Sequence, residues 1–121
     1  MIQEKAFVGT ISDVVELEAF RKSRQELGIT DDELNELKNA IINNPNVGDA
    51  ISGCNGARKV RIKLESNNKG KSGGARIIYV NVYIQEKAYL IDIYGKSDKE
   101  DLTTKEKKLI STIIDILKNK K

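Results

Sequence analysis

Seven cationic side chains lie close together in the middle of the chain. Residues 57–79 carry these seven and one acidic side chain, a net charge of +6, whereas the whole 121-residue chain carries +3. Such a concentration of positive charge is typical of a surface that binds phosphate-rich ligands, and RNA or DNA is the expected class. The seven are Arg58, Lys59, Arg61, Lys63, Lys69, Lys71 and Arg76.

These residue types could cleave RNA. In one ribonuclease reaction the 2′-OH attacks the neighbouring phosphorus, which requires a base, stabilisation of the phosphorane and a proton for the leaving 5′-oxygen. Crowded cations lower the pKa of a lysine, so that it can serve as base or acid, and the planar arginine fork suits a phosphate. The chain has no histidine and one cysteine, Cys54. We therefore expect neither a zinc site, nor a disulfide, nor a cofactor.

A hairpin is expected to position these cations. Residues 59–64 alternate, which predicts a strand with Lys59, Arg61 and Lys63 on one face and the apolar residues on the other. Further strands are predicted at 77–84 and 89–94, giving a three-stranded antiparallel meander. The loop before the second strand contains Gly70-Lys71-Ser72, but it lacks the earlier glycine of a nucleotide-binding loop and precedes a strand. This loop either contacts phosphate without forming that motif or is a solvated hairpin loop.

Helices are expected before and after the meander in the sequence. A short strand is predicted at residues 5–11, followed by a helix capped by Asp13 with Glu16 three residues on. Thr30 and Thr103 are predicted to cap two more helices, and Pro45 to end the first of these. The pattern predicts an α+β fold in a single domain over residues 1–121, with a short N-terminal strand, a two-helix hairpin, the meander and a C-terminal helix.

Two side chains near the meander leave alternatives open. Arg76 either contacts phosphate or pairs with Glu65 to hold the hairpin. Tyr94, at the end of the last strand, is the tyrosine we single out as a possible base-stacking or acid–base group, because packing explains the other three better. Asp92 lies on the same strand face and is predicted to pair with the cationic strand.

Three segments resemble a known family. GDAISGCNGARKVRIKL, KGKSGGARIIYV and YLIDIYGKSDKEDLTTKEKK are similar to the HigB-type branch of the RelE/ParE superfamily, the toxins of bacterial type II toxin–antitoxin modules. The resemblance implies a RelE-like α+β fold with helices on one face of an antiparallel sheet. It also implies an mRNA endonuclease that acts on the ribosome, needs no metal and inhibits translation.

The resemblance assigns roles by motif. It implies Lys59 or Lys71 as base and Arg61 and Arg76 at the scissile phosphate. Lys96 would be a further phosphate contact or the acid. RelE-like members place a catalytic tyrosine after the last strand, where this chain has Leu102 and Thr103, so Tyr94 is a substitute candidate. The expected RNA contacts are Arg58, Lys63 and Lys69.

The resemblance also implies partners. These are the ribosome, mRNA and a cognate antitoxin. The antitoxin is expected to be HigA-like and to carry a helix-turn-helix domain, and the toxin would contact DNA only indirectly, through this antitoxin. The chain has no long apolar run, so we expect a cytoplasmic protein without a membrane partner. Two alternatives remain: a ParE-like inhibitor of DNA gyrase without nuclease activity, and a non-catalytic RNA-binding domain.

Overall fold

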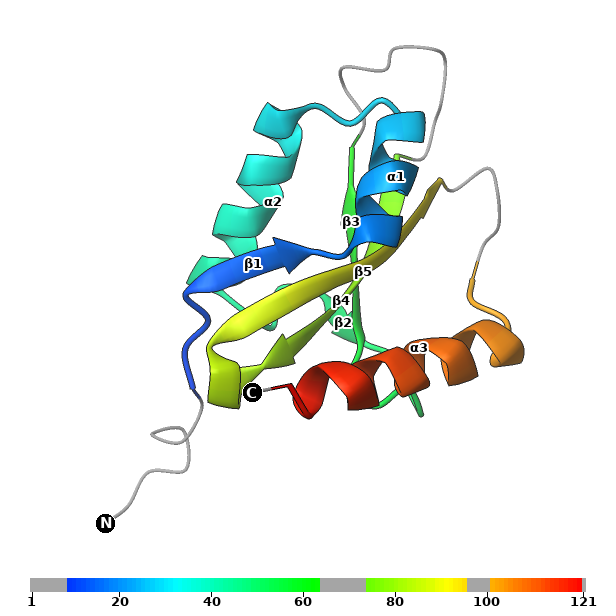
Figure 1. Cartoon of the computed structure of the whole chain (residues 1–121). Helices are drawn as coiled ribbons and strands as arrows, with labels where there is room; N and C mark the ends of the chain where they lie inside the picture. Colours follow the sequence, from blue (N-terminus) through cyan, green and yellow to red (C-terminus); the bar gives the residue numbers. More distant parts are fainter. Residues whose placement is uncertain (1–8, 64–73, 96–100, 121) are drawn as a thin grey trace.

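A five-stranded mixed sheet forms the centre of the molecule (Figure 1). The computed structural model describes residues 9–63, 74–95 and 101–120. The strands lie in the order β1-β5-β4-β3-β2, with β1 parallel to β5 and the other pairs antiparallel. Their bounds are β1 Asp13–Glu16, β2 Asp49–Ala50, β3 Arg58–Ile62, β4 Ala75–Val82 and β5 Lys87–Gly95. The predicted α+β class and the meander, here β3-β4-β5, are confirmed.

Helices cover both faces of this sheet. The helices α1 (Glu18–Glu26) and α2 (Asp31–Asn43) lie on one face, and α3 (Thr104–Lys118) lies on the other (Figure 1). Phe20, Leu34 and Ile41 pack with Ile77 and Leu90 on the first face. A second apolar cluster joins α3 to the opposite face. The expectation of helices on one face is therefore wrong, because β4 and β5 are apolar on both faces and each face needs a cover.

The beginning of the described chain differs most from prediction. Residues 1–8 lie outside the described residues, so the strand expected at 5–11 is untested there, and residues 9–12 are not strand. β1 begins at Asp13 and ends at Glu16, so these two residues do not cap a helix. α1 begins only at Glu18. Val14 pairs with Ala88 of β5 and is buried. Burial of the strand in the sheet outweighs the local capping signal.

The helix boundaries predicted from Thr30, Thr103 and Pro45 are confirmed. Gly28 lies two residues beyond the end of α1 and has φ 77°, a left-handed conformation that favours glycine. Thr30 and Thr103 each form a complete capping box, with Glu33 and Glu106 respectively. α2 ends at Asn43, two residues before Pro45. No helix in the described ranges is long and apolar enough to cross a membrane.

Tyr79 fastens the loop between α2 and β2 to the sheet. Its hydroxyl donates to the Pro45 carbonyl at 2.7 Å and accepts from the Gly48 N–H at 3.0 Å. A Cβ on Gly48 would lie 2.6 Å from the carbonyl oxygen of Lys59, so only glycine fits there. The Gly48 carbonyl in turn accepts from Arg58 Nε at 2.9 Å. This network places β3 in register with β4.

Candidate functional site

Three predicted site residues form one row across the meander. Arg61 of β3 is the direct partner of Arg76 of β4, and Arg76 is the direct partner of Tyr94 of β5. Directly paired residues of antiparallel strands project to the same face, with Cβ atoms about 5 Å apart. The next row contains Lys59, Ile78 and Asp92. Ile78 packs with α3, so both rows lie on the α3 face of the sheet.

A bulge in β5 brings Tyr94 to this face. Ile78 pairs with Asp92, but Tyr79 pairs with Leu90, which leaves Ile91 as an extra residue. Before the bulge Tyr89 packs in the α3 cluster, and after it Tyr94 does so too, although the two lie five positions apart. Strict alternation would have placed Tyr94 on the α1–α2 face. The site therefore depends on one inserted residue.

Lys59 is held by a carboxylate that sequence reasoning did not select. Its Nζ lies 3.6 Å from Oδ1 of Asp101, in the segment leading into α3. A hydrogen bond from the Leu102 N–H, together with the charge of Lys59, lowers the pKa of Asp101, which stays ionised. Asp92, the predicted partner, accepts from the Ile93 N–H at 2.9 Å. The signal for Asp101 was weak, since only the position of α3 brings it to Lys59.

Arg76 presents a donor to this site. Its side chain is half-buried, and its Nη1 is buried without a hydrogen-bond partner in the part of the chain that the structure describes. A buried guanidinium N–H without a partner is costly and rare in proteins unless a ligand completes it. Glu65, the alternative partner, lies outside the described residues. The described contacts thus leave Arg76 ready to accept an anion.

Tyr94 is almost covered, with 5% of its surface exposed. Burial raises the pKa of its phenol, and the nearby charge of Asp101 raises it further, although Arg76 opposes the shift. A phenol with a raised pKa keeps its proton at neutral pH. In this environment Tyr94 is suited to donate a hydrogen bond or a proton, and poorly suited to act as a base.

A comparison with protein families identifies the fold's relatives. Residues 13–121 match the model of the RelE toxin of the RelE/RelB toxin–antitoxin system. The chain belongs to the RelE toxin family. This membership confirms the RelE/ParE superfamily, and it means that an antitoxin is the expected partner in general.

A solved RelE structure has the same fold. The chain is similar to a double arginine-to-alanine mutant of the E. coli toxin RelE in the free state, with a TM-score of 0.51. The likeness covers 75% of this chain and 90% of the other, at 12% sequence identity. At that identity the match supports the RelE fold and says nothing about individual residues. The assignment of roles must come from this chain's own geometry.

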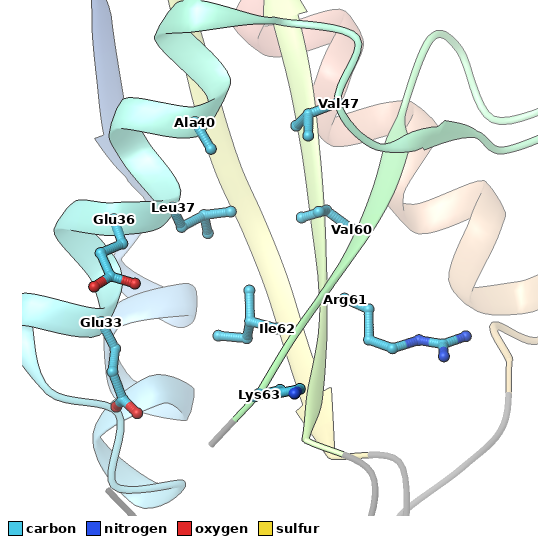
Figure 2. Close-up of a pocket in the computed structure, with 9 residues that line it drawn as sticks. All are labelled: Glu33, Glu36, Leu37, Ala40, Val47, Val60, Arg61, Ile62 and Lys63. Carbon is cyan, nitrogen blue, oxygen red and sulfur yellow. The ribbon is translucent and has the colours of Figure 1, made fainter. Parts of the chain in front are cut away.

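A groove lies between β3 and α2, on the face of the sheet opposite α3, and it shows to which face each β3 side chain of this RelE-family protein projects. Figure 2 shows Val60 and Ile62 directed towards Leu37 of α2, whereas the side chain of Arg61, which also lines the groove, extends away from α2. The predicted alternation is confirmed within β3, for residues 59–62, but not for Lys63, which was expected beside Lys59 and Arg61. Lys63 lies just beyond β3 and lines this groove.

The structure brings together four of the predicted site residues of this RelE-family chain and separates others. Lys59, Arg61, Arg76 and Tyr94 share the α3 face. Arg58, expected among the RNA contacts, is paired with Tyr79 and lies on the other face, where it binds the carbonyls of Gly48 and Asn46. The predicted site residues outside the described residues are Lys69, Lys71 and Lys96.

Within the described ranges, no group of three or more Cys, Asp or Glu side chains could hold a metal ion.

Proposed function

We propose that this chain is a HigB-type mRNA endonuclease that cuts mRNA on the ribosome and thereby stops translation. The observation that carries the proposal is the row of Arg61, Arg76 and Tyr94 on adjacent strands. Two cations and a protonated phenol on one surface supply both charge stabilisation and a proton donor. Lys59, in the next row, adds an amine beside them.

The proposed step requires no co-reactant. A base removes the proton of the 2′-OH, and O2′ forms a bond to the adjacent phosphorus. The bond from phosphorus to O5′ then breaks, and an acid protonates O5′. The products are a 2′,3′-cyclic phosphate and a 5′-OH end. The developing negative charge resides on the phosphorane oxygens, where guanidinium groups stabilise it most.

The residues divide between these tasks. Arg61 and Arg76 bind the phosphorane oxygens, and the buried, partnerless Nη1 of Arg76 supports this role. Lys59 or Lys71 is the base. Tyr94 donates the proton to O5′, and its raised pKa supports this assignment because the phenol is protonated at pH 7. Lys96 adds a phosphate contact. No metal is part of this mechanism.

The antitoxin partner follows from the same surface. We propose a HigA-like antitoxin that places an acidic segment on the face carrying Lys59 and Arg61 and that contacts DNA through its own helix-turn-helix. Opposite charges across such an interface accelerate association and select the partner. The ribosome and mRNA are the targets of the free toxin.

The test is mRNA cleavage in a purified translation system, with and without ribosomes. Wild-type protein is expected to produce ribosome-dependent cuts with 2′,3′-cyclic phosphate ends. Arg76→Lys keeps the charge but loses the planar fork, and we expect cleavage to fall about 100-fold or more. The matched control is Arg21→Lys, an exposed arginine on α1, which should cleave like wild type.

Four results would contradict the proposal. Arrest of translation with intact mRNA would favour binding without catalysis, and inhibition of DNA supercoiling by gyrase would favour a ParE-like inhibitor. Equal cleavage by Arg76→Lys and wild type would remove Arg76 from the reaction. Translation that proceeds unaffected by wild-type protein would leave a non-catalytic RNA-binding domain.

A further inference from the structure

A second basic hollow lies at the far end of α3. It has a volume of about 460 Å³ and opens between the turn that joins β4 to β5 and the C-terminal end of α3. In Figure 1 this end of α3 lies beside that turn. The lining consists of three lysines and three residues without charge at neutral pH, and includes no acid. The six are Ile84, Gln85, Lys87, Tyr89, Lys118 and Lys120.

The walls of this hollow are fixed by contacts within the chain. Gln85 Nε2 donates to the Leu117 carbonyl at 2.8 Å and to the Lys120 carbonyl at 3.4 Å, which joins the turn to the helix end. The Tyr89 hydroxyl donates a hydrogen bond to Gln85 Oε1. The Lys120 Nζ lies 5.9 Å from the centroid of the Tyr89 ring, so the lysine is oriented by the aromatic face. A site fixed in this way loses little entropy on binding.

The lysines are not explained by the helix alone. Lys118 and Lys120 suit the negative end of the α3 dipole, but Gln85 already donates to two of the last carbonyls. Lys87 belongs to β5 and has no relation to that dipole. Burial raises the pKa of Tyr89, so the phenol contributes no negative charge to offset the lysines.

Three acids lie near the hollow without lining it, namely Glu86, Asp115 and Asp13, the register partner of Lys87. Glu86, between Gln85 and Lys87, accepts a hydrogen bond from Ser12 Oγ. Asp115 accepts from Asn55 Nδ2, and Asn55 Oδ1 accepts from Lys118 Nζ at 3.2 Å. The lining of the hollow therefore presents three lysines and no carboxylate. The hollow is the kind of site that a phosphate group neutralises.

We propose that this hollow is a second RNA contact, a site for the phosphate backbone of a folded RNA. It rests on the proposed function, because a ribosome-dependent nuclease must dock on folded RNA while its active site holds mRNA. Seven residue steps of β5 separate Lys87 from Tyr94, a distance of roughly 23 Å. One phosphate cannot reach both, so the hollow anchors the protein separately from the site of cleavage.

The test measures binding to purified ribosomes over a range of salt, with every protein carrying Arg76→Ala to prevent cleavage. Lys87→Gln/Lys120→Gln removes two charges from the hollow and leaves Lys118, which supports Asn55. We expect the affinity to fall roughly tenfold and the slope of log K against log salt to fall by about 1 for each lysine. The control Lys22→Gln/Lys108→Gln removes two exposed lysines elsewhere and should bind like the parent.

The outcomes separate this inference from the proposed function. If the parent does not bind ribosomes, the proposed function fails. If the parent binds and the hollow variant binds equally well, or if the control loses as much, the second contact is wrong and the proposed function stands. A parallel titration uses a short single-stranded RNA. A loss confined to ribosomes supports folded RNA, whereas an equal loss with the short RNA overturns that assignment in favour of the mRNA strand.

Discussion

Arg61 and Arg76 are direct cross-strand partners, so two arginine side chains project from adjacent positions on the α3 face. Like charges directly opposite on a sheet destabilise it. Such a pair favours the binding of an anion, because the bound anion relieves the repulsion between the two cations. The pairing indicates a surface arranged for a ligand at some cost to stability.

We predict that Arg61→Gln stabilises the fold while it impairs cleavage. Removing one guanidinium relieves the repulsion, so the free energy of unfolding should rise by up to about 1 kcal/mol at low salt. The gain should shrink at high salt because exposed charges are screened. Urea denaturation at two salt concentrations measures both effects.

Arg21→Gln serves as the control for this comparison. Arg21 is exposed on α1 and lies 4.0 Å from Glu16, so its loss should leave stability unchanged or slightly reduced. A lower stability of Arg61→Gln at low salt would show that the two guanidinium groups do not repel each other in the free protein.

Asp101→Asn should release Lys59. The ion pair holds the Lys59 ammonium in place, and a phosphate must compete with the Asp101 carboxylate for it. We expect tighter binding of short RNA, by a few-fold at low salt, together with slower cleavage because the amine is no longer oriented. Fluorescence anisotropy and single-turnover cleavage measure the two changes.

Asp32→Asn is the matched control for Asp101→Asn. Asp32 is exposed at the start of α2, and it too loses one negative charge. Equal tightening in both variants would mean that net charge, and not the pair with Lys59, governs RNA affinity.

Among the charged side chains near the surface, we predict that Glu16 contributes most to the stability of the fold. Its side chain is 8% exposed and lies 2.8 Å from Arg24 Nε and 3.4 Å from Lys38 Nζ, so it joins β1 to α1 and α2. Glu16→Ala removes the carboxylate that both cations share, while Arg24 keeps Asp31, and it should lower the free energy of unfolding by about 1–3 kcal/mol. Glu26→Ala, at the exposed end of α1, should change it far less. Comparable losses in urea denaturation would contradict the role of Glu16.

The stability should also depend on pH through Glu16. Burial alone would raise the pKa of Glu16, but its hydrogen bonds and charge interactions with Arg24 and Lys38 outweigh burial and lower it from 4.5. The unfolded chain therefore takes up the proton first. The contribution of Glu16 is complete above about pH 4.5 and is lost as the pH falls through the lower folded value.

Glu16→Gln should remove this part of the pH dependence. The difference in unfolding free energy between wild type and Glu16→Gln should be largest near pH 7 and should shrink below pH 4.5. Glu26→Gln provides the comparison, and its profile should run parallel to that of wild type. A constant difference between wild type and Glu16→Gln down to pH 3 would exclude the lowered pKa.

Local signals predicted the parts of the fold that local contacts determine. The caps at Thr30 and Thr103 depend on residues three positions away, and both formed. The position of β1 depends on β5, whose residue Lys87 pairs with Asp13, and no local pattern reports such a pairing. The capping signal at Asp13 was therefore misleading.

The candidate site was predictable to the extent that alternation holds. Lys59 and Arg61 share a face as expected, and the same alternation would have placed Arg58 with Val60 on the other face. The bulge at Ile91 changes the face of every later β5 residue, and neither glycine nor proline marks it in the sequence. Asp101 reaches Lys59 only through the packing of α3.

The parallel pairing of β1 with β5 has a consequence for synthesis. Asp13 and its partner Lys87 lie 74 positions apart, so the first strand made must wait for the last strand of the sheet. At about 5–20 residues per second this delay is roughly 4–15 s. The row on β3, β4 and β5 likewise forms only after Tyr94 has been added. A ribosome that makes this protein is therefore not exposed to the proposed cleaving surface until most of the chain has been translated.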